Sequence, residues 1–171
     1  MSRATGLDKV ITAAVTGFIV VLALAAWWDS TIVWLHVLQA LMYVATIVLV
    51  LRHDRWGYFL GFSIAAFWNY ANFFVTNFFR AGLEQVSILI HTGALPRPDL
   101  FISVPAVTFH FIMIVDCAVA YLRLRAKPAS DVLRFAIAFF GSIAFFAADM
   151  MLTQPRYLAI FPRLLHPQLH I

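Results

Sequence analysis

Residues 57–79 read GYFLGFSIAAFWNYANFFVTNFF, which is long enough and apolar enough to cross a bilayer as one helix. The small and polar residues in this run recur at steps of three and four. On a helix with about 100° per residue they share one stripe of roughly 120°. The members of the stripe are Gly57, Gly61, Ala65, Asn69, Asn72 and Thr76. The stripe begins with residues that allow close packing and ends with two carboxamides at membrane depth.

The composition of the whole chain indicates a membrane protein. The chain has 171 residues, of which 63% are hydrophobic and 12% charged, and its mean hydropathy is +0.89. A soluble domain of this size carries about 25% charged residues. The chain has room for about five spans with short connections. We therefore predict an all-α polytopic membrane protein that forms a single transmembrane domain over residues 1–171, with no room for a soluble catalytic domain.

Apolar stretches bounded by polar residues predict where the spans lie. We expect spans at about residues 10–27, 31–51, 57–79, 103–124 and 131–152. Between the third and fourth spans, Leu83, Val86 and Ile90 are spaced like one face of a short amphipathic helix, which we expect in the membrane interface. Beyond the fifth span we expect an irregular stretch or a short helix at the membrane surface.

The positions of Lys and Arg predict the orientation. With the N-terminus in the cytoplasm, the cytoplasmic side holds Arg3, Lys9, Arg52, Arg55, Arg123, Arg125, Lys127 and Arg134, and the outside holds Arg80, Arg97, Arg156 and Arg163. This excess supports an N-terminus inside and a C-terminus outside. We expect an integral protein of the bacterial inner (plasma) membrane. Because the net charge of +4 comes from these loop residues, we do not expect nucleic acid as a partner.

Polar side chains recur in the outer half of the predicted spans. Such groups are costly inside a bilayer and are candidates for function by default. The candidates for ligand binding, from the second to the fifth span, are His36, Tyr43, Asn69, Asn72, His110 and Asp149. If these faces converge, they line one cleft that is open to the outside. The alternative for Asn69 and Asn72 is hydrogen bonding between helices. For His36 it is a place near the lipid headgroups, and for Asp149 a helix end that faces water.

Asp116 differs from the other candidates because it lies deeper, toward the cytoplasmic half of the fourth span. It follows His110 by six residues, so it points roughly 120° away from it on a helix. An unpaired ionised carboxylate is costly there. We expect a partner such as Arg123, a protonated state, or a role in handling protons or charge.

Several classes of function remain open for these residues. The first is binding or transport of a small polar or amphipathic ligand, because carboxamides offer donors and acceptors. The second is an accessory or assembly subunit of a larger membrane complex, or a homo-oligomer. Small residues such as Ala13 and Gly17 on the first span, and the glycines of the third, form faces that seat neighbouring helices.

Two further classes use the histidines. A membrane enzyme acting on a lipidic substrate would use His110 with Asp149 or Asp116 as acid and base. A b-type haem protein would use His36 and His110, which lie at similar depth on different spans.

No motif in the chain decides between these classes. We find no HExxH, no nucleophile elbow and no cluster of acidic metal ligands, so we expect no metal site and assign no catalytic residue. His166 and His170 are four residues apart, but Pro167 between them disfavours a helical metal pair.

Overall fold

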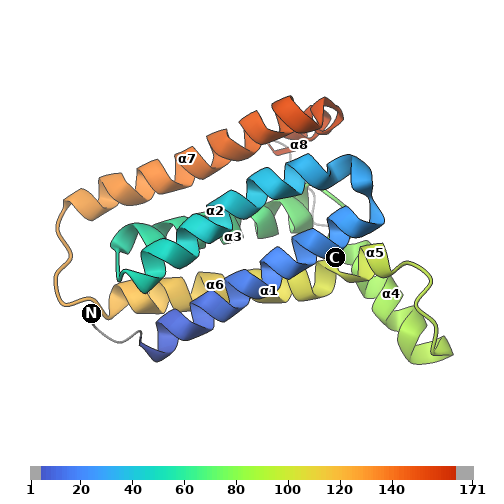
Figure 1. The fold of residues 1–171 in the computed structure, drawn as a ribbon, viewed down its shortest axis with the longest axis horizontal. Coiled ribbons are helices and arrows are strands. Elements are labelled where there is room, and N and C mark those ends of the chain that lie inside the picture. The colour runs from blue at the N-terminus through green and yellow to red at the C-terminus, as the bar shows by residue number, and fades with distance from the viewer. Residues whose placement is uncertain (1–4, 165–171) are drawn as a thin grey trace.

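The structure is a computed structural model that describes residues 5–164, so His166 and His170 lie outside the described part. Within this part every regular element is a helix. Four stretches are long and apolar enough to cross a membrane, namely Gly6–Trp28, Ser30–Leu51, Pro98–Leu122 and Ser130–Thr153. The chain is therefore a helical bundle with the character of an integral membrane protein (Figure 1).

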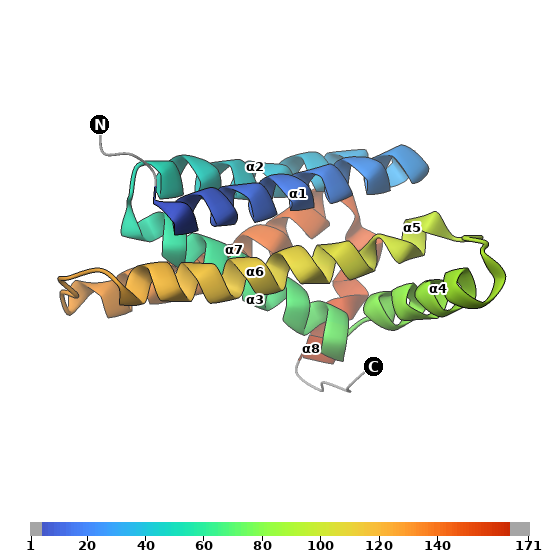
Figure 2. The ribbon, with the colours of Figure 1, turned by 90° about the horizontal axis from the view of Figure 1, so that it is seen from below.

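Five long helices build the bundle. They are α1 (Gly6–Trp28), α2 (Val33–Leu51), α3 (Arg55–Phe74), α6 (Ser103–Leu122) and α7 (Ser130–Thr153). Shorter elements connect or follow them: η1 (Ser30–Ile32), α4 (Phe78–Thr92), α5 (Pro98–Phe101), η2 (Pro155–Ile160) and α8 (Phe161–Leu164). Helices α1 and α2 lie side by side, and α4 projects from one end of the bundle (Figure 2).

The two ends of the bundle differ in charge. We call one the α4 end, where α1, α3 and α7 finish and α2 and α6 begin (Figure 1). The opposite end, which we call the basic end, carries Lys9, Arg52, Arg55, Arg123, Arg125, Lys127 and Arg134. The helix order therefore gathers at one end the described basic residues that the sequence assigns to the cytoplasm.

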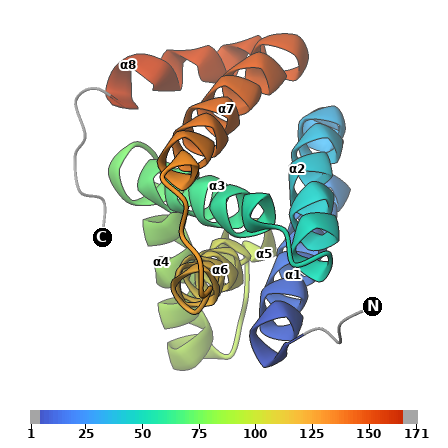
Figure 3. The ribbon, with the colours of Figure 1, turned by 90° about the vertical axis from the view of Figure 1, so that its left-hand side faces the viewer.

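Helix α3 is the centre of the bundle. It packs against α2, α6 and α7 and lies between them when the bundle is viewed from its basic end (Figure 3). The helical part of the predicted stripe faces inward, because Gly57, Gly61, Ala65, Asn69 and Asn72 are all buried. Its polar side chains contact protein, so this helix needs less hydrophobicity than its neighbours, and it is not among the four apolar stretches.

The prediction of where the third span ends is wrong. We expected one helix over residues 57–79, but α3 ends at Phe74 and α4 begins at Phe78. Val75 and Thr76 both donate their backbone N–H to the Ala71 carbonyl, at 3.0 and 2.9 Å. The Thr76 hydroxyl then accepts from the Phe78 N–H at 3.4 Å. A hydroxyl that bonds nearby backbone competes with the helix, which explains the break.

The expected amphipathic segment is present as a helix, α4, that is longer than the predicted face. Its Leu83 and Ile90 are exposed, with 40% and 74% of their surface accessible. Its Gly82 lies against α5 and α6, because a methyl group there would come within 2.9 Å of the Leu100 carbonyl oxygen. One side of α4 is therefore attached to the bundle, and an apolar side is open to the surroundings.

The glycines of α3 seat two neighbouring helices. A methyl group at Gly57 would lie 2.6 Å from the backbone nitrogen of Val50 on α2. One at Gly61 would lie 2.8 Å from the sulfur of Cys117 on α6. The stripe is therefore a packing seam within this chain.

Of the two small residues on the first span that we expected to seat a neighbouring helix, only one does so. Gly17 is covered by the ring of Phe109 on α6, which a methyl group there would meet at 2.6 Å. Ala13 is exposed. Since the glycines are engaged inside the bundle, they no longer provide an argument for an accessory subunit.

Candidate functional site: a cleft at the α4 end

A cleft of about 610 Å³ lies at the α4 end, among α1, η1, α2, the end of α3, the start of α4, and α5, with Met150 of α7 at its side. Its polar lining consists of Asp29, His36, Gln39, Asn72, Thr76 and Asp99. Aromatic rings form much of its wall, namely Phe18, Trp28, Trp68 and Phe78. Two of the predicted site residues, His36 and Asn72, therefore share one cavity.

The cleft lies where α3 ends. Asn72 from the last turn of α3, Thr76 from the break and Phe78 from the first turn of α4 all line it. No described residue donates a backbone N–H to the carbonyls of residues 72–74. Non-helical backbone at membrane depth is tolerated where protein buries it or where it lines a cavity. In transporters, such broken helices mark binding sites.

Two buried carboxamides each keep a free group at the cleft. Gln39 and Asn72 are both 6% exposed. The Gln39 carbonyl oxygen lies 3.2 Å from Nδ1 of His36, and the Asn72 NH₂ donates to the Trp68 carbonyl at 2.8 Å. The NH₂ of Gln39 and the carbonyl oxygen of Asn72 have no hydrogen-bond partner in the described part of the chain. Gln39 follows His36 by three residues, and that spacing is the sequence signal for it.

Tyr43 and His110 form a buried pair behind the cleft. The Tyr43 hydroxyl lies 2.8 Å from Nε2 of His110, and both side chains are fully buried. The centroids of the Phe18 and Trp68 rings lie 4.0 and 4.5 Å from that of the His110 ring. Both rings also line the cleft. They form a wall between the cleft and the pair, so Tyr43 and His110 support the cleft without lining it.

The geometry does not favour a haem between His36 and His110. Nε2 of His110 is occupied by Tyr43, and the imidazole is covered by Phe18 and Trp68. His36 bonds Gln39 through Nδ1, and its Nε2 has no partner among the described residues, so the geometry against a haem is that of His110. An axial ligand needs a free ring nitrogen that faces an open cavity, whereas Nδ1 of His110, which has no partner among the described residues, is buried behind the Phe18 and Trp68 rings.

Asn69 and Asp149 are buried away from the cleft lining. Within residues 5–164, neither polar atom of the Asn69 carboxamide has a hydrogen-bond partner. Asp149 on α7 has the Thr153 hydroxyl at 3.4 Å from Oδ1, while its Oδ2 has no partner in the described part of the chain. The neighbour of Asp149 in the sequence, Met150, lines the cleft instead. The six candidates are therefore distributed over the cleft, the pair behind it and the packed interior.

Asp116 is half-buried on α6. It makes no hydrogen bond or ion pair with any described residue, so the expected link to Arg123 does not form. The acid–base arrangement considered for an enzyme does not form either, since among the described residues the His110 ring bonds the Tyr43 hydroxyl and neither Asp149 nor Asp116.

At the basic end, sequence reasoning missed a buried carboxylate on α1. Asp8 accepts hydrogen bonds from the backbone N–H and the hydroxyl of Thr5, at 2.8 and 2.7 Å. The Tyr58 hydroxyl donates to it at 2.9 Å, and Nδ1 of His53 lies 3.1 Å away. Asp8 therefore ties the start of α1 to the α2–α3 turn. The sequence signal is the capping box that Thr5 and Asp8 form.

A second buried carboxylate at the basic end holds α7. Asp131 is paired with Arg55 at 2.9 Å and with Arg134 at 3.2 Å, and the Tyr121 hydroxyl donates to it at 3.3 Å. It joins the starts of α3 and α7 to the end of α6. Because these charges are paired with one another, this cluster is a structural clamp.

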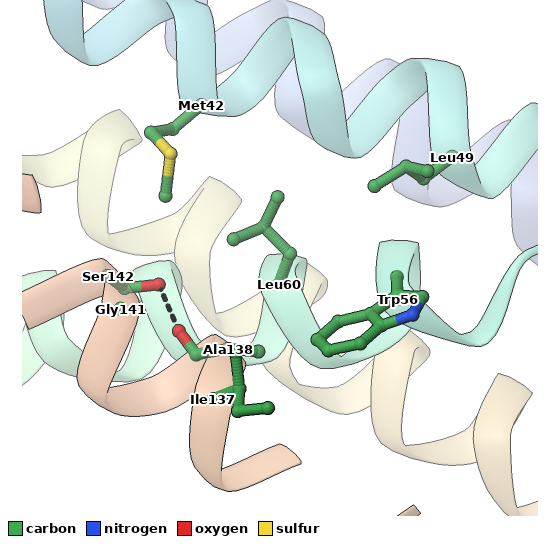
Figure 4. Close-up of a pocket in the computed structure, with 8 residues that line it drawn as sticks. All are labelled: Met42, Leu49, Trp56, Leu60, Ile137, Ala138, Gly141 and Ser142. Atoms are coloured by element: carbon green, nitrogen blue, oxygen red, sulfur yellow. Dashed lines mark hydrogen bonds between the residues drawn. The ribbon is translucent and has the colours of Figure 1, made fainter. Parts of the chain in front are cut away.

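Another cavity, of about 270 Å³, lies among α2, α3 and α7 (Figure 4). Its lining is Met42, Leu49, Trp56, Leu60, Ile137, Ala138, Gly141 and Ser142. The Ser142 hydroxyl donates to the Ala138 carbonyl of its own helix at 2.6 Å. With that hydroxyl engaged and no charged residue in the lining, this cavity suits hydrocarbon.

Neither a metal site nor a comparison with known proteins assigns a function to this chain. Among residues 5–164, no group of three or more His, Cys, Asp or Glu side chains is placed to hold a metal ion. The chain matches no protein-family model, no curated protein and no solved structure. The function is therefore argued from the residues of the cleft.

Proposed function

We propose that the protein binds, and moves within or across the membrane, a small polar or amphipathic ligand held in the cleft at the α4 end. The observation that carries this proposal is the pair of carboxamides, Gln39 and Asn72, each 6% exposed and each with a free group at the cleft. Leaving such groups unpaired costs free energy. A ligand that bonds to both recovers that cost, and this supplies affinity.

Transport would also require a path from the cleft to the basic end of the bundle. The Tyr43–His110 pair and the packed core lie between the cleft and the basic end. The break at residues 75–77 supports a transport role, because short non-helical segments absorb the backbone rotation that opens and closes such sites.

The proposal includes a topology. We infer five spans, with the basic end in the cytoplasm and the α4 end outside, in the inner membrane of a bacterium. The inward-facing position of α3 supports its being a fifth span, since a helix covered by others can carry polar residues through a bilayer. The concentration of Lys and Arg at the basic end supports the orientation.

A pair of matched variants on α1 tests whether the cleft binds a ligand. Ala25 lines the cleft, whereas Ala13 on the same helix is exposed. We expect a small molecule to co-purify, in mild detergent, with the wild-type protein and with Ala13→Phe but not with Ala25→Phe, whose ring fills the cleft. The measurement is mass spectrometry of extracted small molecules, with thermal unfolding as a check on folding.

Two outcomes would contradict the proposal. One is a compound retained equally by the folded Ala25→Phe variant. The other is the absence of any retained compound from all three proteins when they are purified with their native lipids.

A further inference from the structure

Three of the polar side chains that line the cleft, on α2 and at the end of α3, carry no formal charge. Gln39, Asn72 and Thr76 are uncharged, and His36 bonds the carbonyl oxygen of Gln39 through Nδ1. None of the described residues that line the cleft is Lys or Arg. An ion that entered this part would lose its hydration without gaining a counter-charge, which is costly in a dry site.

The two carboxylates at the cleft are already engaged. Asp99 is held by Arg97, whose Nε and guanidinium NH₂ donate to it at 3.0 and 2.7 Å. Asp29 accepts from the Thr31 N–H at 2.9 Å and from the Thr31 hydroxyl at 2.6 Å. Arg156 donates to that same hydroxyl at 3.1 Å, which places a positive charge near Asp29. Neither acid is therefore an open site for a cationic ligand.

The free groups of the carboxamides are complementary to one kind of head group. Gln39 has an NH₂ donor to offer, and Asn72 has a carbonyl acceptor. A hydroxyl or an amide on the ligand both donates and accepts, so it satisfies the two together. The apolar side chains of Val21, Leu22 and Ile102 line the same cleft and suit a hydrocarbon portion.

We infer that the ligand of this cleft is an uncharged amphiphile whose hydroxyl or amide head group bonds to Gln39 and Asn72. This inference rests on the proposed function and names the class of molecule that the site takes.

Three probes of equal chain length and different charge test this class. They are monodecanoylglycerol, which is uncharged, decyltrimethylammonium and decyl sulfate. The readout is protection of Thr76→Cys from a maleimide, in nanodiscs and with Cys117→Ala removing the native cysteine. Ser87→Cys, exposed on α4 and outside the cleft lining, reports any effect of the probes on the bilayer.

We expect monodecanoylglycerol to slow modification of Thr76→Cys about tenfold, at concentrations roughly tenfold below those that either charged probe needs. Modification of Ser87→Cys should not change. Adding Asn72→Ala should weaken protection by the uncharged probe about tenfold, because one hydrogen bond is lost. Asn77→Ala, at an exposed position outside the cleft lining, should leave it unchanged. If Thr76→Cys fails to fold, Ala25→Cys on α1 gives the same readout.

The outcomes separate this inference from the proposed function. Stronger or equal protection by either charged probe would overturn the uncharged class while leaving a ligand-binding cleft. Protection that survives Asn72→Ala at full strength would overturn the head-group assignment. No protection by any probe, at either cysteine position, would contradict both proposals.

Discussion

At the scale of single residues, the two buried carboxylates with several polar partners, Asp8 and Asp131, lie at the basic end, away from the cleft. Asp8 has three hydrogen bonds and a histidine partner in a fully buried position. A buried carboxylate is stable only when such partners compensate its lost hydration. The two carboxamides of the cleft differ from these acids, since Gln39 and Asn72 each leave one group without a partner among the described residues. The fully paired groups stabilise the fold, whereas the groups without a partner are available to bind a ligand.

Replacing Asp8 tests the structural role of the basic end. Asp8→Ala leaves the Tyr58 hydroxyl and His53 without their partner, and we expect it to lower the free energy of unfolding by about 2–4 kcal/mol. The control is Asp116→Ala, which removes a half-buried carboxylate with no hydrogen bond among the described residues. It should cause little loss, about 0.5 kcal/mol or less. Equilibrium unfolding in mixed micelles measures both, and equal losses would argue against the assigned role.

At the scale of elements, α3 organises the bundle through two kinds of residue on one face. Its glycine half brings α2 and α6 into close contact. Its Asn72 end, followed by the break at Thr76, opens the cleft. One helix therefore sets both the tight packing of the basic half and the cavity at the α4 end.

Glycine substitutions test the packing seam. Gly57→Ala places a methyl group 2.6 Å from the backbone nitrogen of Val50, which cannot move without shifting α2. We expect a loss of about 1–3 kcal/mol in the free energy of unfolding. Gly141→Ala on α7 is the matched control, since nothing lies within 4 Å of the added carbon. It should gain about 0.5–1 kcal/mol from helix propensity. A stabilising Gly57→Ala would show that α2 does not pack on this seam.

At the scale of the whole molecule, the arrangement of helix ends predicts which loops share a side of the membrane. In a background with Cys117→Ala, we expect Arg52→Cys and Ala126→Cys to react with a membrane-impermeant maleimide only after cells are permeabilised. Ala94→Cys should react in intact cells. All three positions are exposed. If Ala94→Cys and Arg52→Cys react from the same side of the membrane, α3 does not span it. If Arg52→Cys and Ala126→Cys react in intact cells and Ala94→Cys does not, the orientation is the reverse of the proposed one.

Hydropathy and residue spacing were sufficient for the helical class and for the position of most helices. An apolar run of sufficient length has few alternatives in a bilayer, because its backbone must satisfy its own hydrogen bonds. The inward face of α3 was also predictable, since small and polar residues at helical spacing avoid lipid. The buried polar residues of α3 lower its mean hydropathy, which leaves it outside the four most clearly apolar stretches.

The end of α3 could not be predicted from its composition. Residues 75–79 remain apolar enough to continue a helix, and the break depends on the local hydrogen bonds of Val75 and Thr76. Capping pairs such as Thr5 and Asp8 were visible in the sequence. Their contacts with Tyr58 and His53 were not, because those join residues far apart in the chain.

The amino-acid order alone indicates the membrane environment and the inward stripe of α3, because these depend on local periodicity and on lipid solvation. It does not specify which polar faces meet. That required the tertiary structure, in which the rotation and closeness of neighbouring helices place His36, Gln39 and Asn72 at one cleft, seclude Tyr43 with His110, and leave Asn69 and Asp149 in the interior. Depth is a property of one helix, whereas a binding site depends on how several helices pack against one another.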